Sequence, residues 1–365
     1  MKIAIYSPYL DTIGGGEKYM LTIAEYLSID SRAQRNDNEV DFLLGTHLYG
    51  LNLPETLQKI QKLHNLNLSK VNFVRAPIGA GSSNIKRLRF LRKYDYLFYL
   101  GDGSIFYSTA KNNILHIQSP IKNIGGIKNK IKLSSWKLII YNSKFTKDLV
   151  EKSWGRPGKV IYPSVSVTEI SAYSKPLKKK KQILSVGRFY GYLKDKKHEF
   201  MINAFKKLVD ENNLKDWSLH LVGGAGEGDN KYIDELKNKT KGLKIFIHPN
   251  LPFDDLKKMY GESVIYWHAM GFGEVDPTKM EHFGITTVEA MAGGVVPVVI
   301  GKGGQTEIVE HGQSGFLWEN AGELLKYTMD LIDDGKLLGK VSREAVKRSK
   351  IFSKERFCQN IQKLI

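Results

Sequence analysis

Two glutamates frame a segment whose backbone and side chains suit an anionic ligand. Glu281 and Glu289 are eight residues apart, and Thr286 and Thr287 lie between them. The pattern predicts that Glu281 lies in a loop and Glu289 in the first turns of the following helix, which either threonine could cap. A helix N-terminus presents amides to a phosphate, and a carboxylate near the same end can accept hydrogen bonds from ribose hydroxyls. The segment is therefore a candidate phosphate-binding and ribose-binding site.

Two cations, Arg188 and Lys196, follow a predicted strand at residues 183–187. They are expected at the edge between two domains, because they come after the carboxyl end of that strand and before a helix. An arginine fork and a lysine ammonium there would stabilise a diphosphate leaving group as its negative charge grows during glycosidic bond cleavage. A structural salt bridge is the alternative role for Arg188.

Three consecutive glycines, residues 14–16, separate a predicted strand from a predicted helix. Glycine lets the backbone approach a ligand closely, and the N–H groups at the start of the helix suit a phosphate or a sugar hydroxyl. The cluster lacks the G-x-G-x-x-G spacing of a dinucleotide site, so a tight turn is the alternative.

The elements that must position these residues alternate along the chain. Apolar strand-like runs and amphipathic helical segments predict an α/β fold, with parallel sheets covered by helices on both faces. At 365 residues the chain suits two domains. We place an N-terminal Rossmann-like domain at 1–165, a polar linker at 166–181 and a C-terminal Rossmann-like domain at 182–350, with a last helix in 351–365 that is expected to cross back to the first domain. The predicted strands are residues 3–7, 40–44, 96–100, 114–118, 138–141, 183–187, 218–222, 244–248, 264–267 and 295–300.

Composition places the chain among globular proteins. Hydrophobic residues make up 42% and charged residues 25%, which excludes a disordered or membrane-embedded chain. No segment reaches the roughly 18 uninterrupted apolar residues of a spanning helix, and residues 1–9 lack the features of a signal peptide. With Cys358 as its one cysteine, the chain fits a reducing compartment, and we expect a cytoplasmic location. The net charge of +17 favours anionic partners: nucleotides, nucleic acid or an acidic membrane.

Taken in order, the motifs resemble those of the retaining glycosyltransferases of family four, also called glycosyl transferases group 1, which have the GT-B fold. The resemblance covers nearly all of the chain. It implies two Rossmann-like domains that face each other across a donor-binding cleft. The motifs are Gly14–Gly16, Asn142-Ser143 with Thr146, Tyr162-Pro163, Val186-Gly187-Arg188, Lys196, Val222-Gly223-Gly224, the Glu281 and Glu289 pair, and Gly303-Gly304 with Glu307.

The resemblance assigns roles to particular residues. Arg188 and Lys196 would bind the donor diphosphate, and Glu281 would face the transferred sugar. Glu289 would hold the ribose. His116, at the end of a predicted first-domain strand, matches the family's sugar-contacting histidine, although a buried structural histidine is the alternative. Further donor contacts are implied at Gly15, Gly16, Gly187, Gly223, Phe283, Gly284, Ile285 and Thr286.

The resemblance also implies the chemistry. A hexose would pass from a nucleotide diphosphate sugar to a glycan or polyprenyl-linked acceptor with retention of configuration, as in polysaccharide biosynthesis. No metal or other cofactor would be required, because Arg188, Lys196 and a helix N-terminus would replace the cation. The form Glu-His-Phe-Gly at 281–284 resembles mannosyltransferases that extend lipid-linked oligosaccharides, which favours GDP-mannose as donor. The chain departs from the family pattern in its long loop at 268–280, which contains Glu274, and in His282, where many members have glycine.

Basic residues concentrate in two first-domain segments, 86–93 and 122–137, the second interleaved with Ile124, Ile127, Ile131 and Trp136. This surface could dock on an anionic membrane leaflet and meet a polyprenyl-linked acceptor there; a solvated basic face is the alternative. Two other functions stay open. One is a nucleotide-sugar epimerase of the same architecture. The other is a basic nucleic-acid-binding protein, although nucleic acid is not an expected partner because no recognised binding motif is present.

Overall fold

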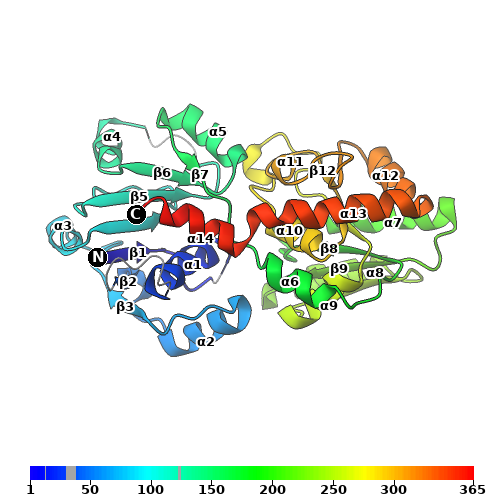
Figure 1. Cartoon of the computed structure of the whole chain (residues 1–365), viewed down its shortest axis with the longest axis horizontal. Helices are drawn as coiled ribbons and strands as arrows, with labels where there is room; N and C mark the ends of the chain where they lie inside the picture. Colours follow the sequence, from blue (N-terminus) through cyan, green and yellow to red (C-terminus); the bar gives the residue numbers. More distant parts are fainter. Residues whose placement is uncertain (13, 30–37, 122–124) are drawn as a thin grey trace. The chain divides into compact units, whose positions relative to one another are not determined.

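The computed structural model describes residues 1–12, 14–29, 38–121 and 125–365 (Figure 1). The chain divides into two compact units. The first contains Met1–Ser164 and Glu355–Ile365, and the second contains Val165–Lys354.

The described part of the first unit is built around a seven-stranded parallel sheet with the strand order β3-β2-β1-β4-β5-β6-β7. Its strands are β1 (Lys2–Tyr6), β2 (Glu39–Leu44), β3 (Val71–Arg75), β4 (Tyr96–Leu100), β5 (Asn112–Ile117), β6 (Leu138–Tyr141) and β7 (Lys159–Val160). Its helices are α1 (Gly15–Ile29), α2 (Leu53–His64), α3 (Asn84–Leu91), α4 (Ile127–Ser134), α5 (Lys144–Trp154) and α14 (Lys354–Gln362), the last of which enters this unit at Glu355.

Helices cover both faces of this sheet because successive side chains of a strand point to opposite faces. In β1, Ile3 and Ile5 join a buried cluster with side chains of α1 and α14. Ala4 and Tyr6 join a second buried cluster with side chains of α3, α4 and α5. The sheet therefore separates two hydrophobic cores, and β1 and β4 are buried from their second residue onward.

The second unit has a six-stranded parallel sheet with the order β10-β9-β8-β11-β12-β13 among the described residues. Its strands are β8 (Gln182–Val186), β9 (Ser218–Gly223), β10 (Ile245–Pro249), β11 (Ile265–His268), β12 (Val296–Ile300) and β13 (Phe316–Trp318). Its helices are α6 (Val167–Ser174), α7 (His198–Asn212), α8 (Asn230–Lys239), α9 (Phe253–Glu262), α10 (Ile285–Ala292), α11 (Gln305–Ile308), α12 (Ala321–Asp333) and α13 (Gly335–Ser349).

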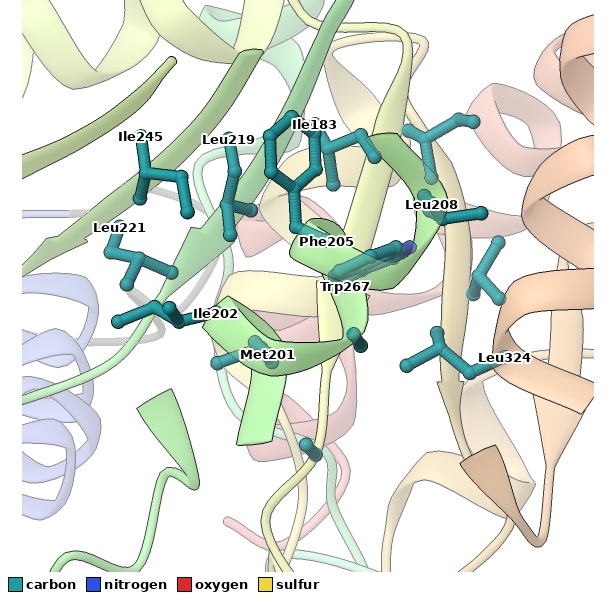
Figure 2. Close-up of a cluster of buried hydrophobic side chains, with 14 of the residues drawn as sticks. Ile183, Met201, Ile202, Phe205, Leu208, Leu219, Leu221, Ile245, Trp267 and Leu324 are labelled. Atoms are coloured by element: carbon teal, nitrogen blue, oxygen red, sulfur yellow. The ribbon is translucent and has the colours of Figure 1, made fainter. Parts of the chain in front are cut away.

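A large buried cluster holds α7 against this second sheet. Figure 2 shows Phe205 of α7 beside Trp267 of β11 and the aliphatic side chains of β8 and β9. Phe205 and Trp267 are each 0% exposed. Burial of large side chains at this junction holds α7 in place, and Lys196 lies two residues before the start of this helix.

The two parallel sheets confirm the predicted α/β fold class and the two Rossmann-like domains. All of the predicted strands are present, with bounds that differ by at most two residues. The prediction omits β3, β7 and β13. Each of these strands lies at the edge of its sheet and has a neighbouring strand on one side only. An edge strand needs fewer apolar residues because part of it faces solvent, and β3 and β7 are only partly buried.

The segment predicted as a linker is partly helical. Residues 167–174 form α6, within the second unit. Val167 and Ile170 are 3% and 0% exposed, one helical turn apart, so even this short helix has a buried face. The lysines that follow also contact the second unit: Lys179 Nζ donates to the Gly293 carbonyl at 2.8 Å, and Lys180 pairs with Glu262 at 2.7 Å.

The C-terminal segment belongs to the first unit from Glu355 onward. Phe357 packs edge-on against Tyr19 of α1, with ring centroids 4.8 Å apart. The Tyr26 hydroxyl donates to Gln362 Oε1 at 3.2 Å. Separately, none of the helices in the described ranges has the length and apolar character to cross a bilayer.

Candidate functional site

Lys196, His268 and Glu281 meet at the carboxyl edge of the second sheet. Lys196 lies in the loop after β8, His268 ends β11, and Glu281 precedes α10. The strands β8 and β11 are neighbours and parallel, so their following residues come together at one edge. Lys196 Nζ donates to Glu281 Oε2 at 2.7 Å, and His268 Nε2 contacts the same oxygen at 3.1 Å.

The charge state of this cluster follows from its contacts. Burial works against ionisation of Glu281, but the Lys196 ammonium and the His268 hydrogen bond together hold the pKa of Glu281 well below its usual range. Burial lowers the pKa of His268, so its imidazole is neutral near pH 7. An ionised carboxylate only accepts hydrogen bonds, so the proton of His268 lies on Nε2. The cluster is thus a lysine cation and a glutamate anion with a neutral histidine donor.

The Lys196–Glu281 pair retains hydrogen-bonding capacity. An ammonium has three N–H donors. Lys196 uses two of them, one on Glu281 and one on Met270 Sδ, 3.1 Å away. Glu281 Oε1 makes no hydrogen bond to any residue in the described ranges. The side chains are 18% and 20% exposed. The pair therefore offers one donor and one acceptor to a ligand.

Two glycines shape the loop that carries Glu281. Gly303 has φ of +62°, and a Cβ there would lie 2.2 Å from the Glu281 carbonyl oxygen. The Gly304 N–H donates to that same carbonyl at 2.7 Å. A Cβ on Gly304 would lie 2.5 Å from Phe283 Cα. Only glycine allows the two backbone segments to approach this closely, so the turn at 303–304 positions Glu281.

Helix α10 begins just after Glu281, but its cap differs from the prediction. The N-cap is Gly284, with φ of +118° and no side-chain cap, so neither predicted threonine caps the helix. Thr286 instead shares a hydrogen bond of 2.8 Å with the hydroxyl of Tyr266 in β11. The amides of Ile285 and Thr286 occupy the first turn, where a helix has no internal acceptors. Phe283 is 3% exposed and packs against Phe352, 5.5 Å away between ring centroids.

Glu289 lies in the second turn of α10 and is 6% exposed. Its Oε2 accepts a hydrogen bond from the Tyr260 hydroxyl at 2.9 Å. Burial raises the pKa of Tyr266, and both Glu281 and Glu289 raise it further, so this tyrosine lies within the field of both carboxylates. The ribose-binding role of Glu289 stays a prediction.

Arg188 stands apart from the Lys196–Glu281 pair. It is exposed, its guanidinium lies 4.8 Å from the Tyr190 ring centroid, and Nη1 donates to the Tyr190 hydroxyl at 2.5 Å. Within the described residues it makes no hydrogen bond or ion pair with Lys196 or Glu281. Its contact with the diphosphate therefore stays a prediction that requires the side chain to leave Tyr190.

Gly187 and Gly223 bring the ends of β8 and β9 close together. A Cβ on Gly223 would lie 1.9 Å from the Gly187 carbonyl oxygen, which is possible for no other residue. A Cβ on Gly187 would lie 2.8 Å from Lys196 Cγ. These glycines have a packing reason of their own, and any donor contact by them stays a prediction.

The glycine loop of the first unit is occupied by a carboxylate. Glu17, in the first turn of α1, is 3% exposed and accepts from the Gly14 N–H at 2.8 Å and from Thr12 Oγ1 at 3.1 Å. Gly15 is exposed, whereas a Cβ on Gly16 would lie 2.4 Å from Gln118 Nε2. A negative charge at this helix N-terminus repels a phosphate, so of the two predicted ligands the loop suits a sugar hydroxyl better.

His116 lies in the core of the first unit. It is 1% exposed, and its ring stacks on Tyr19 with centroids 3.8 Å apart. Burial lowers the pKa of His116 to about 3, against an opposing effect of the Ile140 backbone, so the ring is neutral at pH 7. This environment matches the alternative of a buried histidine, and the predicted sugar contact stays untested.

The sequence interpretation missed several residues at this site. His268 ends β11, Tyr266 lies within the same strand, and Tyr260 lies in the last turn of α9; each contacts a predicted site residue. His268 directly follows the predicted strand 264–267, but that position alone does not mark a functional residue. No sequence signal pointed to Gln305, which is 0% exposed, packs against Gly284, and has no hydrogen-bond partner for its amide in the described structure.

The basic segments of the first unit include exposed apolar side chains. Ile85 of α3 is 64% exposed, and Ile127 and Ile131 of α4 are 77% and 57% exposed. Exposed lysines flank them, among them Lys128 and Lys130. Lys122 and Ile124, which belong to the same predicted surface, lie outside the described residues.

One family model matches about half of the chain. Residues 166–348 match the family described as Glycosyl transferases group 1. This range begins just before α6 and ends within α13, and it includes Arg188, Lys196, Glu281 and Glu289.

Curated relatives include mannosyltransferases. The chain is 27% identical over 251 residues to a GDP-Man:Man(3)GlcNAc(2)-PP-Dol alpha-1,2-mannosyltransferase from Dictyostelium discoideum, covering 63% of this chain and 47% of the relative. It is 27% identical to the human protein of the same name, covering 60% and 46%. An alpha-1,3/1,6-mannosyltransferase from Rhizomucor pusillus is 26% identical, covering 49% and 46%. The chain thus spans about half the length of these relatives.

Solved structures share the fold over the whole chain. The Anabaena protein HepE in complex with UDP and glucose has a TM-score of 0.66 at 18% identity, covering 100% of this chain and 98% of that chain. A glycosyltransferase from Rickettsia africae has a TM-score of 0.72 at 18% identity, covering 98% and 96%. Sucrose-phosphate synthase from Thermosynechococcus elongatus has a TM-score of 0.69 at 14% identity, covering 100% and 98%. The likeness identifies the GT-B fold.

Proposed function

Because the chain belongs to the glycosyl transferases group 1 family, we propose that it is a retaining glycosyltransferase that uses a nucleotide diphosphate sugar. The observation that carries this proposal is the Lys196–Glu281 pair, which offers one donor and one acceptor at the carboxyl edge of the second sheet. Glu281 lies three residues before Gly284, the N-cap of α10. A cation, a carboxylate and a helix N-terminus together suit a sugar attached to a diphosphate.

In this proposal Lys196 donates to a phosphate oxygen while it stays paired with Glu281. The first-turn amides of α10 would stabilise the same leaving group, and Arg188 would add a guanidinium after it leaves Tyr190. Glu281 Oε1 would accept a hydrogen bond from a hydroxyl of the transferred sugar. His268 would keep Glu281 oriented, because it donates to the other carboxylate oxygen.

The bond from the sugar C1 to the diphosphate oxygen breaks, and a bond from C1 to the acceptor oxygen forms on the same face of the ring. The acceptor proton passes to the departing phosphate oxygen, so no strong protein base is required. The charge that develops on the diphosphate is met by Lys196, Arg188 and the start of α10, and we propose that no metal ion is needed.

Mannose is the sugar that we propose, with GDP-mannose as donor. The names of the curated relatives state that donor for several of them, together with a PP-Dol-linked acceptor. The Glu-His-Phe-Gly sequence at 281–284 supports the same donor. We propose a glycan or polyprenyl-linked acceptor for this chain, reached at the cytoplasmic face of a membrane.

A binding screen tests the donor. GDP-mannose, GDP, UDP-glucose, UDP-N-acetylglucosamine and ADP-glucose are added to the full chain, and the thermal unfolding midpoint is measured. A ligand at 100 times its Kd stabilises a folded protein by about 2.7 kcal/mol, which gives a measurable rise. We expect the largest rise with GDP-mannose. No rise with any member of the panel would contradict the proposed donor site.

Product analysis tests the reaction. The donor that binds is incubated with the chain and a lipid-linked oligosaccharide, with and without EDTA, and the product is treated with α- and β-specific glycosidases. Transfer with the anomeric configuration of the donor, unchanged by EDTA, is the expected result. Complete loss of transfer activity in EDTA, restored by added metal, would refute metal independence. An isomerised sugar nucleotide formed in the absence of acceptor would identify an epimerase.

A further inference from the structure

A cavity of about 590 Å³ lies within the first unit, and none of the residues discussed above as a donor contact lines it. Tyr6 ends β1, and Tyr99 and Asp102 lie at the end of β4 and just beyond it; all three line the cavity. In the sheet, β2 lies on one side of β1 and β4 lies on the other, so the strand order changes direction between β1 and β4. The carboxyl ends of such a strand pair are where open α/β sheets bind ligands.

One wall of this cavity is aromatic. Tyr6 and Tyr99 stack with ring centroids 5.4 Å apart and an interplanar angle of 17°. Phe106 extends the wall, 4.9 Å from Tyr99 between centroids. Tyr9 also lines the cavity and is 39% exposed. Rigid aromatic faces of this kind bury the apolar faces of small ligands, with a few polar groups fixing orientation.

The cavity contains a guanidinium that pairs with no carboxylate of the described residues. Arg87 of α3 lines it, with its guanidinium 5.2 Å from the Phe106 ring centroid. Nη2 donates to Asn84 Oδ1 at 2.8 Å, whereas Nε is buried and has no hydrogen-bond partner in the described structure. Burial lowers the pKa of Arg87, and no described carboxylate contributes to it. A partly buried cation that lacks an anion is costly, and an anionic ligand would remove that cost.

The carboxylates that share the cavity do not serve as that counter-ion. Asp102 Oδ1 accepts from the Tyr99 hydroxyl at 2.9 Å and from the Ser104 N–H at 2.8 Å. Asp11 also lines the cavity, and within the described residues it forms no ion pair with Arg87. The two acids are suited to accept hydrogen bonds from hydroxyl groups, while Arg87 is suited to an anion.

We propose that this cavity binds the acceptor and that Arg87 holds a phosphate group which the acceptor carries. The aromatic wall packs against the group attached to that phosphate, and Asp11 and Asp102 accept hydrogen bonds from its hydroxyls. The inference rests on the proposed glycosyl transfer and names the class of its acceptor, a phosphorylated saccharide or a prenyl phosphate. A guanidinium fork matches two oxygens of a phosphate.

Binding of small probes to the full chain tests this assignment. The probes are mannose 1-phosphate and farnesyl phosphate, with mannose, farnesol and inorganic phosphate as references, all in saturating GDP to fill the donor site. Arg87→Gln removes the charge and the fork. Arg89→Gln is the matched control, because Arg89 is an exposed arginine on the same helix and its loss changes the net charge equally.

We expect one phosphorylated probe to bind more tightly than its uncharged counterpart and than inorganic phosphate. Arg87→Gln should weaken that binding by about 10- to 100-fold, the range for a hydrogen bond to a charged group. Arg89→Gln should leave it within about twofold, since an exposed charge contributes little. The preferred probe identifies the class of acceptor. Preference for farnesyl phosphate indicates a prenyl phosphate, and preference for mannose 1-phosphate indicates a phosphorylated saccharide.

Equal binding to the wild type and Arg87→Gln would overturn the proposal, as would equal losses in both variants or equal affinity for inorganic phosphate. GDP binding by each variant reports whether it is folded, and Arg87→Lys, which keeps the charge but lacks the fork, replaces Arg87→Gln if that chain does not fold. An intermediate loss in Arg87→Lys is then expected, and no loss contradicts the proposal. If GDP does not bind the wild type, the donor proposal fails. Binding of the phosphorylated probes to the wild type and to the Arg87 variants is then compared without GDP.

Discussion

Lys196 Nζ lies 2.7 Å from Glu281 Oε2, although 85 residues separate the two in sequence. The contact forms because β8 and β11 are neighbouring parallel strands whose following loops meet at one sheet edge. Burial works against ionisation of Glu281, but the Lys196 ammonium and the His268 hydrogen bond keep the pKa of Glu281 well below its usual range, so the carboxylate stays ionised. A ligand that places a phosphate beside Lys196 therefore enters a site in which the neighbouring carboxylate is already fixed in place.

Replacing Lys196 should impair turnover. Lys196→Gln removes the cation beside the developing diphosphate charge, and we expect kcat to fall by roughly 10²- to 10³-fold, as when one preorganised donor is lost. Lys194→Gln is the matched control, because Lys194 lies in the same loop but is 51% exposed and pairs with Glu235. Steady-state transfer kinetics measure both variants. Near-normal kcat and donor KM in Lys196→Gln would exclude the lysine from the site.

The buried His116 should make the first unit sensitive to acid. Its folded-state pKa is about 3, whereas an unfolded chain has an ordinary value near 6.5. The unfolded state therefore binds more protons in the window between these values, and stability falls as pH drops through it, by at most about 1.4 kcal/mol for each pH unit. His116→Phe, which keeps a flat ring against Tyr19, should show a shallower loss. Unfolding midpoints between pH 4 and 7.5 compare the two chains, and identical slopes would contradict the buried, neutral state.

The turn at Gly303 should be intolerant of a side chain. In Gly303→Ala the new Cβ meets the Glu281 carbonyl oxygen at 2.2 Å in a left-handed conformation, so the loop that carries Glu281 must move. We expect a loss of about 1–3 kcal/mol in stability, together with lower transfer activity. Gly228→Ala is the control, since a Cβ there has no neighbour within 4 Å. The unfolding midpoints and transfer rates of the two variants are compared. Equal values would show that the turn does not position Glu281.

The basic surface of α3 and α4 should bind anionic vesicles. Ile127 and Ile131 are exposed beside Lys128 and Lys130, a composition that suits the interface of an acidic leaflet. We expect sedimentation with phosphatidylserine vesicles but not with phosphatidylcholine vesicles, and weaker binding at high salt. The double variant Lys128→Gln/Lys130→Gln should bind more weakly, by about fivefold for each lysine removed. Each lysine near an anionic surface contributes about 1 kcal/mol to the binding free energy. Absence of binding to both vesicle types would dismiss the membrane partner.

Periodicity and composition predict the central part of the fold well. Strands such as β4 and β12 are buried on both faces, so they are continuous apolar runs that stand out in the sequence. The edge strand β7 has two residues, both at least partly exposed, and its pattern is indistinguishable from a loop. Helix α6 is missed for a related reason: only two of its three buried residues, Val167 and Ile170, are apolar, which is too few to outweigh the polar residues around them.

The candidate site is predicted in part. Lys196 and Glu281 are recognisable from motifs, and their contact follows once the strands are placed. The partners that fix their chemistry are not: His268 and Tyr266 belong to a strand whose end gives no functional signal, and Gly284 replaces the expected threonine cap because the chain there turns left-handed. The counter-ion-free state of Arg87 depends on burial by residues distant in sequence, which no local pattern reports.

A crystal structure of the chain with the nucleoside diphosphate of its preferred donor tests the central claim most directly. The account predicts diphosphate oxygens within hydrogen-bonding distance of Lys196 Nζ and of the first amides of α10, with the Arg188 guanidinium turned from Tyr190 toward them. A nucleotide bound elsewhere, with Lys196 contacting only Glu281 and Met270, would contradict it.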